Sequence, residues 1–212
     1  MYKKILKKII VIIFGLPFVF IIRIFSPILK IKIGFFYGER IGHLSQDAEI
    51  YLAEKSLNLF EKSYEFFFIG GKVSNKFLVT LIKRKIFISS FVSLIYSANR
   101  LIKGYEKYEY IPAVIRNYGS RDLSGVLPKT KPHLEFLKEE NYKGKDFLKK
   151  IGCNKKFICL SIRDSAYLTN SFPENDFTYH DYRDSDINTY KKEINYLIDK
   201  DYFIIRMGKM VN

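Results

Sequence analysis

Short apolar runs alternate along the chain with segments that carry apolar residues at helical spacing. The near-continuous apolar runs predict strands and cover residues 31–37, 65–69, 157–163 and 202–208. The segments with an apolar stripe predict helices and cover residues 45–56, 75–85, 142–151 and 187–200. A further apolar run spans residues 86–94. Repeated alternation of strands and helices indicates an α/β layer structure rather than a helix bundle.

The segment 157–208 predicts one strand–helix–strand unit with two arginines at one edge. In such a unit the two strands run parallel, and the crossover between them is almost always right-handed. Their near-continuous apolar sequences predict that both strands are buried on both faces of a sheet. Arg163 and Arg206 follow these strands and therefore emerge at the same carboxyl edge, where open α/β sheets bind ligands. Two guanidinium groups there suit a phosphate or pyrophosphate. Alternatively, each arginine pairs with a neighbouring carboxylate, as Arg163 could with Asp164.

A long connection, residues 165–184, follows the first of these strands. Connections in compact α/β units usually have about 2–6 residues, and much longer ones are commonly functional or disordered. This one is rich in aromatic residues, which argues against a disordered linker. We expect it to form part of the site, with a surface elaboration as the alternative. Its candidate site residues are Tyr167, His180, Asp181 and Arg183.

Near the amino terminus, the strand 31–37 is followed by a glycine turn and a helix expected to begin at Ser45. Such a start presents free backbone N–H groups to an anion or polar ligand. Arg40, Gly42 and His43 would lie in the turn, and Asp47 in the first helical turn. Alternatively, Arg40 pairs with Glu39 and His43 is an ordinary partly buried histidine.

Residues 1–30 are basic and apolar without any acidic residue. The uncharged run 9–22 has 14 residues, fewer than the ~20 that a spanning helix needs, and it contains Pro17. Basic residues on both sides of it favour a hairpin or in-plane helix on an anionic membrane surface. A spanning anchor, with the Arg23 side chain reaching the interface, is the alternative.

Composition and charge narrow the class of partner. The 212 residues are 48% hydrophobic, which is enough for a packed core, and carry a net charge of +14. About seven net positive charges lie in each of the blocks 1–36 and 72–107, which favours an anionic partner. Residues 153–190 are slightly acidic, so a nucleic-acid partner is disfavoured. Two cysteines without metal-ligand spacing indicate reduced, structural thiols.

A turn-rich segment suggests where the domains divide. The predicted organisation is a membrane-associated segment 1–30, an N-terminal Rossmann-like lobe 31–116, a linker 117–141 and a partial C-terminal lobe 142–212.

Four short motifs, at residues 39–44, 162–168, 179–187 and 205–208, resemble a family of bacterial glycosyltransferases associated with surface-polysaccharide gene clusters. The arginine after a strand is also similar to that of fucosyltransferase-like enzymes with two Rossmann-like domains, the GT-B architecture. Members of the family would continue well beyond Asn212, so the resemblance implies an incomplete second lobe.

The resemblance implies transfer of a sugar from a nucleotide-sugar donor to a lipid-linked or polysaccharide acceptor at the cytoplasmic face of the inner membrane. Arg163 and Arg206 would bind the donor phosphates, and His43 or Asp47 would be the catalytic base, with His180 and Asp181 as lesser candidates. No cofactor or metal is expected. The competing hypothesis is a non-catalytic, membrane-associated fragment or scaffold.

Overall fold

The computed structural model describes Leu6 and residues 9–208. It is a mixed α/β structure, as predicted, and it divides into two compact units, Met1–Phe136 and Leu137–Asn212. The boundary between these units falls within the segment 117–141 that the sequence suggested as a linker. Each unit is described by itself below.

Unit 1 is built on a parallel sheet. Strands β1 (Ile31–Tyr37) and β2 (Tyr64–Gly70) pair in parallel from Ile31↔Tyr64 to Tyr37↔Gly70. Single parallel bridges add one segment to each outer edge, Phe67↔Ile88 beside β2 and Ile33↔Glu109 beside β1. Numbered along the chain, the four segments therefore lie in the order 3-2-1-4, so the sheet grows first to one side of β1 and then to the other.

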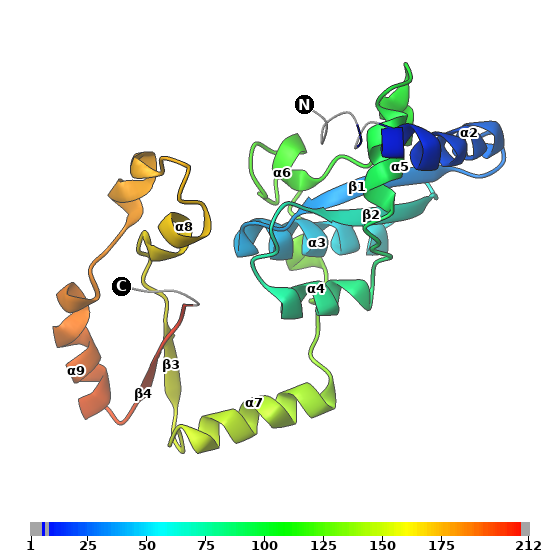
Figure 1. The fold of residues 1–212 in the computed structure, drawn as a ribbon. Coiled ribbons are helices and arrows are strands. Elements are labelled where there is room, and N and C mark those ends of the chain that lie inside the picture. The colour runs from blue at the N-terminus through cyan, green and yellow to red at the C-terminus, as the bar shows by residue number, and fades with distance from the viewer. Residues whose placement is uncertain (1–5, 7–8, 209–212) are drawn as a thin grey trace. The chain divides into compact units, whose positions relative to one another are not determined.

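Helices cover both faces of this sheet (Figure 1). On one face lie α3 (Ile41–Ser56) and α4 (Lys76–Lys83), and on the other lie α5 (Val92–Asn99) and α2 (Leu16–Phe25), which a turn of π-helix, η1 (Val11–Gly15), precedes. Shorter helices follow at η2 (Tyr105–Tyr108), α6 (Ala113–Arg116) and η3 (Leu127–Lys129).

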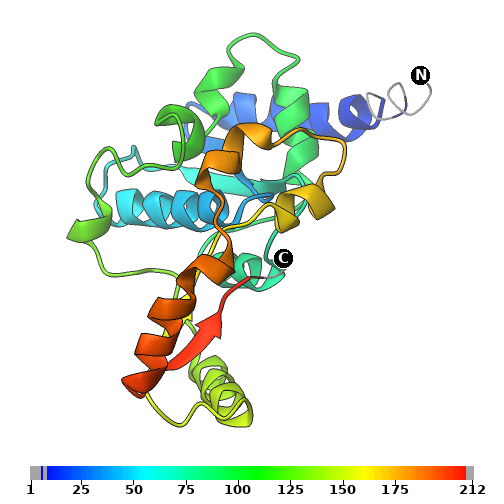
Figure 2. The same cartoon turned by 90° about the vertical axis from the view of Figure 1, so that its left-hand side faces the viewer.

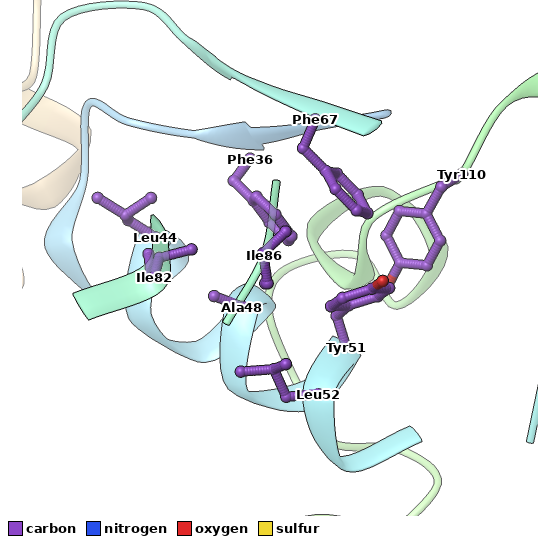
Figure 3. Packing of buried hydrophobic residues seen from close by; sticks show 9 residues of the cluster. All are labelled: Phe36, Leu44, Ala48, Tyr51, Leu52, Phe67, Ile82, Ile86 and Tyr110. Atoms are coloured by element: carbon purple, nitrogen blue, oxygen red, sulfur yellow. The ribbon is translucent and has the colours of Figure 1, made fainter. Parts of the chain in front are cut away.

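The α3–α4 face contains a core cluster that is rich in aromatic rings (Figure 3). The rings of Phe36 and Phe67 stack with their centroids 4.7 Å apart, and Tyr51 meets Phe67 edge to face at 4.9 Å. Such pairs stabilise a core beyond the burial of their area. The buried members of the cluster are Phe36, Leu44, Ala48, Tyr51, Leu52, Phe67, Ile82, Ile86 and Tyr110.

Two boundaries in unit 1 differ from the sequence predictions. Helix α3 begins at Ile41 rather than Ser45, because Arg40 has an extended backbone and its carbonyl accepts the Leu44 N–H. The apolar run 86–94 is not one element. Its ladder bonds to β2 end at Ser89, whose N–H donates to the Phe67 carbonyl, and α5 begins at Val92.

The N-terminal apolar segment is part of this unit. Val11, Val19 and Ile22 are buried in a second cluster with Ile33, Val92, Ile95, Tyr96 and Ala98. In the described part of the chain, no helix combines the length and the apolar character that crossing a membrane requires. Four of the lysines that made this end basic in the prediction (Lys3, Lys4, Lys7 and Lys8) lie outside the described residues.

Unit 2 contains the predicted strand–helix–strand arrangement (Figure 2). Strands β3 (Phe157–Leu160) and β4 (Phe203–Arg206) pair in parallel, in register from Phe157↔Phe203 to Leu160↔Arg206. Between them lie α8 (Ala166–Ser171), η4 (Thr178–Arg183), η5 (Ile187–Tyr190) and α9 (Lys191–Asp199), and α7 (Lys138–Lys150) precedes them.

The expected burial of β3 and β4 on both faces is wrong for this structure. Every residue of the two strands is exposed or only partly buried, so the apolar sequence is not matched by a second covering layer within unit 2. Cys153 is a buried free thiol, whereas Cys159, in β3, is an exposed free thiol.

Candidate functional site

The carboxyl edge of the unit 1 sheet brings together two segments that are far apart in the sequence. Strand β1 leads into α3, and the segment after Glu109, on the other side of β1, leads into α6. Ligands of open parallel sheets bind in the crevice where connections leave neighbouring strands in opposite directions. At this edge the imidazole Nδ1 of His43, in the first turn of α3, lies 2.7 Å from the hydroxyl oxygen of Ser120.

Asp47 lies one turn further along α3 and is completely buried. Neither of its carboxylate oxygens makes a hydrogen bond of normal geometry to the described residues. Burial raises the pKa of Asp47 to about 6, although interactions with Ser120, the Val114 backbone and Arg116 partly oppose this rise. The carboxyl group therefore titrates close to neutral pH, which suits proton transfer.

His43 is half-buried beside this carboxyl group. Burial, with a smaller contribution from the nearby Arg40 charge, lowers the pKa of His43, which favours the neutral imidazole at pH 7. When the Nδ1–H group donates to Ser120 Oγ, the other ring nitrogen, Nε2, is free to accept a proton. His43 and Asp47 each interact with Ser120, and the His43 imidazole can act as a general base toward a hydroxyl.

An ion pair joins α3 to α6 near Asp47. Arg116 of α6 donates from Nη2 to Glu54 Oε2 of α3 at 2.8 Å, and from Nε to the Ile111 carbonyl at 2.8 Å. The Glu54 side chain is 4% exposed, so the pair joins α3 and α6 at a site where Glu54 has little access to water. We infer that Arg116 is a positioning residue, because its charge also lowers the pKa of Asp47.

Sequence reasoning found His43 and Asp47 but missed Ser120 and Arg116. Ser120 follows Tyr118 and Gly119, which both have positive φ, in a segment that showed only a turn signal. Arg116 lies in a four-residue helix too short for a periodic pattern. No sequence signal linked either residue to α3.

Of the two other residues predicted for the turn at this edge, Arg40 lies in the turn and Gly42 does not. Arg40 is exposed and precedes α3. Gly42 lies within the first turn of α3 instead of a tight turn, and a Cβ at this position would meet no atom within 4 Å. Position 42 therefore does not need glycine-specific backbone geometry.

The carboxyl edge of the unit 2 strands carries both predicted arginines. Arg206 ends β4 opposite Leu160, and Arg163 follows Leu160 by three residues. Each guanidinium contacts a carboxylate, since Arg163 Nε lies 2.9 Å from Asp184 Oδ1 and Arg206 Nη2 lies 3.0 Å from Asp164 Oδ2. Both arginines therefore pair with a carboxylate, as the alternative interpretation of the sequence had it. Asp164, however, pairs with Arg206 and not with Arg163.

Neither arginine is closed off from solvent. Their side chains are 32% and 25% exposed, and Arg206 also lines a groove of about 420 Å³ with Leu160, Ile204 and residues of α9. A guanidinium has five N–H donors in a planar fork, so one carboxylate partner is compatible with an added phosphate contact.

The long connection of unit 2 is folded rather than extended. Asp164 Oδ1 accepts the Ala166 N–H at the start of α8, and the Ser185 N–H returns to the Arg163 carbonyl at 2.9 Å. These bonds hold both ends of the connection at the arginine edge. Among the predicted loop residues, Tyr167 and His180 are partly buried, and Asp181 and Arg183 are exposed.

Among the described residues, no three or more His, Cys, Asp or Glu side chains are grouped so that they could hold a metal ion. Comparisons of the chain with protein-family models, curated proteins and solved structures found no match. The site is therefore interpreted from its own geometry and chemistry.

Proposed function

We propose that the protein is a glycosyltransferase that moves a sugar from a nucleotide-sugar donor to a lipid-linked or polysaccharide acceptor in bacterial surface-polysaccharide synthesis. In this proposal the two units correspond to the Rossmann-like lobes of a GT-B architecture. Unit 1 provides the base for the acceptor, and unit 2 provides cations for the donor phosphates. The proposed location is the cytoplasmic face of the inner membrane.

The observation that carries the proposal is the His43–Ser120–Asp47 group at the carboxyl edge of the unit 1 sheet. The segment order 3-2-1-4 matches the first four strands of the doubly wound order 3-2-1-4-5-6, which reverses direction beside strand 1. A neutral imidazole and a carboxyl group with a pKa of about 6 are suited to remove the proton from an acceptor hydroxyl as that oxygen attacks the sugar. We assign this step to His43 Nε2, with Ser120 orienting the ring.

In unit 2, Arg163 and Arg206 support a role in donor binding. A nucleoside diphosphate leaves the donor with increasing negative charge on its phosphate oxygens, and fixed cations stabilise that charge most in the transition state. Both guanidiniums lie at the carboxyl edge of a parallel strand pair, where Asp184 and Asp164 restrict their orientations. Arginine side chains that are already restricted lose less conformational entropy when a phosphate binds than unrestricted ones would.

The test is calorimetric titration of the full chain with UDP, GDP, CDP and inorganic pyrophosphate. At least one nucleoside diphosphate should bind, and Arg163→Ala or Arg206→Ala should each weaken it by roughly 10-fold or more, the value of a charge-assisted hydrogen bond. Lys145→Ala, which removes an exposed cation of α7 in the same unit, is the matched control and should bind like the original protein.

The outcomes separate the proposal from its competitor, a non-catalytic scaffold. Equal affinities of the arginine variants and the Lys145→Ala control would remove the arginines from donor binding. If no nucleoside diphosphate binds at all, the scaffold function is favoured. The half-exposed β3 and β4 and the groove beside them would then be a surface for a macromolecular partner.

A further inference from the structure

One side of α2 presents a long apolar surface to solvent. Its residues recur every three or four positions, as on one face of a helix, and each side chain is 43–88% exposed. They are Phe14, Phe18, Ile21, Phe25 and Ile28, flanked by Ile13, Phe20 and Ile24. This set is called the outer face of α2 below. A continuous exposed face of this kind on a folded protein usually marks a contact with another apolar phase.

The opposite side of the helix fixes it to unit 1. Val19 and Ile22 are buried against α5, and a Cβ added at Gly15 would come within 2.6 Å of the Leu94 carbonyl oxygen and 2.7 Å of Ala98 Cβ. The two backbones therefore approach closely at this glycine. Because the inner face is occupied by the core of unit 1, the helix cannot bury its outer face by turning over.

The single charged side chain within residues 9–29 is directed inward. Arg23 donates from Nη1 to the Lys103 carbonyl at 3.0 Å and from Nη2 to Asn99 Oδ1 at 3.1 Å, and its guanidinium lies 4.9 Å from the centre of the Tyr108 ring. It binds carbonyl groups just after the end of α5. This contact argues against the alternative in which the Arg23 side chain of a spanning anchor reaches the membrane interface, and it leaves the outer face without charge.

Basic side chains gather where α2 ends. Lys30 and Lys32 follow the helix, and Lys32 Nζ donates to the carbonyl of Lys107, in the turn that also contains Lys103. Glu61, which pairs with Lys30, and Glu106 are the acids among these residues, which leaves a net charge of about +2. A hollow of about 580 Å³ begins at Ile28 and Leu29 and is also lined by three lysines and two glutamates, Lys30, Lys55, Lys62, Glu61 and Glu65.

We propose that the outer face of α2 lies in the plane of a lipid bilayer surface that contains anionic headgroups. The apolar side chains would enter the region between headgroups and acyl chains, and the lysines at the helix end would meet lipid phosphates. The lysines that gather at the end of α2 favour an anionic lipid surface over a protein partner. This inference is independent of the proposed sugar transfer, and it places unit 1 itself on the membrane.

The test uses the absence of tryptophan from the chain, which makes an introduced tryptophan a unique probe. Ile24→Trp should show a blue-shifted emission when vesicles of phosphatidylcholine mixed with phosphatidylglycerol are added. Leu123→Trp, at a position that is 65% exposed in the loop before η3, is the matched control and should show no shift. A shift in neither protein, or an equal shift in both, would overturn the proposal.

A second arm measures sedimentation of the full chain with the same vesicles. Ile21→Glu/Ile24→Glu should lower the bound fraction by at least about 10-fold, because two charges enter the apolar face. The control Tyr118→Glu/Leu123→Glu should leave binding unchanged. Lys103→Gln/Lys107→Gln should weaken binding only when phosphatidylglycerol is present. Unchanged binding of the Ile21/Ile24 variant, or a dimer in sedimentation velocity that this variant abolishes without any vesicle binding, would sink the idea.

Discussion

The side chains of His43 and Ser120 lie 2.7 Å apart, although 77 residues separate them in the sequence. The contact joins the first turn of α3 to the loop after α6. The connections to these two helices leave neighbouring strand segments of unit 1 in opposite directions. Asp47, one turn further along α3, also interacts with Ser120, and most of the proposed chemistry depends on these three residues.

Asp47 should make the stability of unit 1 depend on pH. Its pKa rises from 3.8 to about 6 on folding, so between these values the folded state binds a proton that the unfolded state releases. The contribution of Asp47 to the free energy of unfolding therefore falls as pH rises from about 4 to 6, by an amount on the order of 3 kcal/mol.

The measurement is urea unfolding of the original protein and of Asp47→Asn across this pH range. The variant cannot ionise at this position, so its stability relative to the original protein should increase as pH rises and then level off above about pH 6. A difference that stays constant with pH would show that the carboxyl group keeps its ordinary pKa in the fold.

Ser120→Ala should raise the pKa of Asp47 further. The interaction with Ser120 opposes the effect of burial, and its loss removes one stabilising contact from the carboxylate. The midpoint of the Asp47 titration, followed by NMR of the side-chain carboxyl carbon, should move upward. A midpoint that stays in place or moves down would mean that the hydroxyl engages His43 alone.

His43→Gln should lower the turnover number for sugar transfer by roughly 100- to 10,000-fold, the usual value of a positioned general base. Donor affinity should change little, because donor binding is assigned to unit 2. The rate should be measured with the donor identified by calorimetry and with membrane lipid extract as acceptor. Gln46→Ala alters an exposed side chain of α3 that the proposal does not use and is the control. Equal rates in both variants would rule out His43 as the base.

The Arg116–Glu54 pair predicts an asymmetric pair of substitutions. Arg116→Leu leaves the nearly buried Glu54 carboxylate without this partner and should cost about 3 kcal/mol of unfolding free energy. Glu54→Leu should cost less, since the arginine side chain is 30% exposed and can reach water.

The double variant Arg116→Leu/Glu54→Leu should therefore recover much of the stability lost in Arg116→Leu, as a double-mutant cycle from urea unfolding can show. Strictly additive losses would indicate that the two side chains act independently. The exposed pair Lys155–Asp201 in unit 2 provides a comparison, with an expected coupling below about 1 kcal/mol.

Substitution of alanine for two glycines in helical segments should change the stability of unit 1 in opposite directions. At Gly15 a Cβ would collide with the backbone of α5, so Gly15→Ala should destabilise unit 1 by about 1–3 kcal/mol. At Gly42 the space is open, so Gly42→Ala should stabilise α3 by about 0.5–1 kcal/mol. Thermal unfolding of both variants checks the pair, and a tolerated Gly15→Ala would mean that α2 does not pack closely on α5.

The sequence by itself determined the α/β class, the positions of β1 to β4 and the shared edge of Arg163 and Arg206. These follow from local patterns, because an apolar run of strand length and a crossover between parallel strands constrain the chain over short distances. It also singled out His43 and Asp47, since a strand followed by a glycine turn and a helix marks a ligand edge.

Only the tertiary structure decided which distant groups meet these residues. Ser120 and Arg116 reach α3 because the fourth strand segment pairs beside β1, a long-range pairing that leaves no periodic signal in the sequence. The carboxylate partners of the two arginines depend on how the connection 165–184 folds back. Within residues 9–29 every residue but Arg23 and Ser26 is apolar, proline or glycine, so composition alone could not tell the face that packs on α5 from the face left exposed.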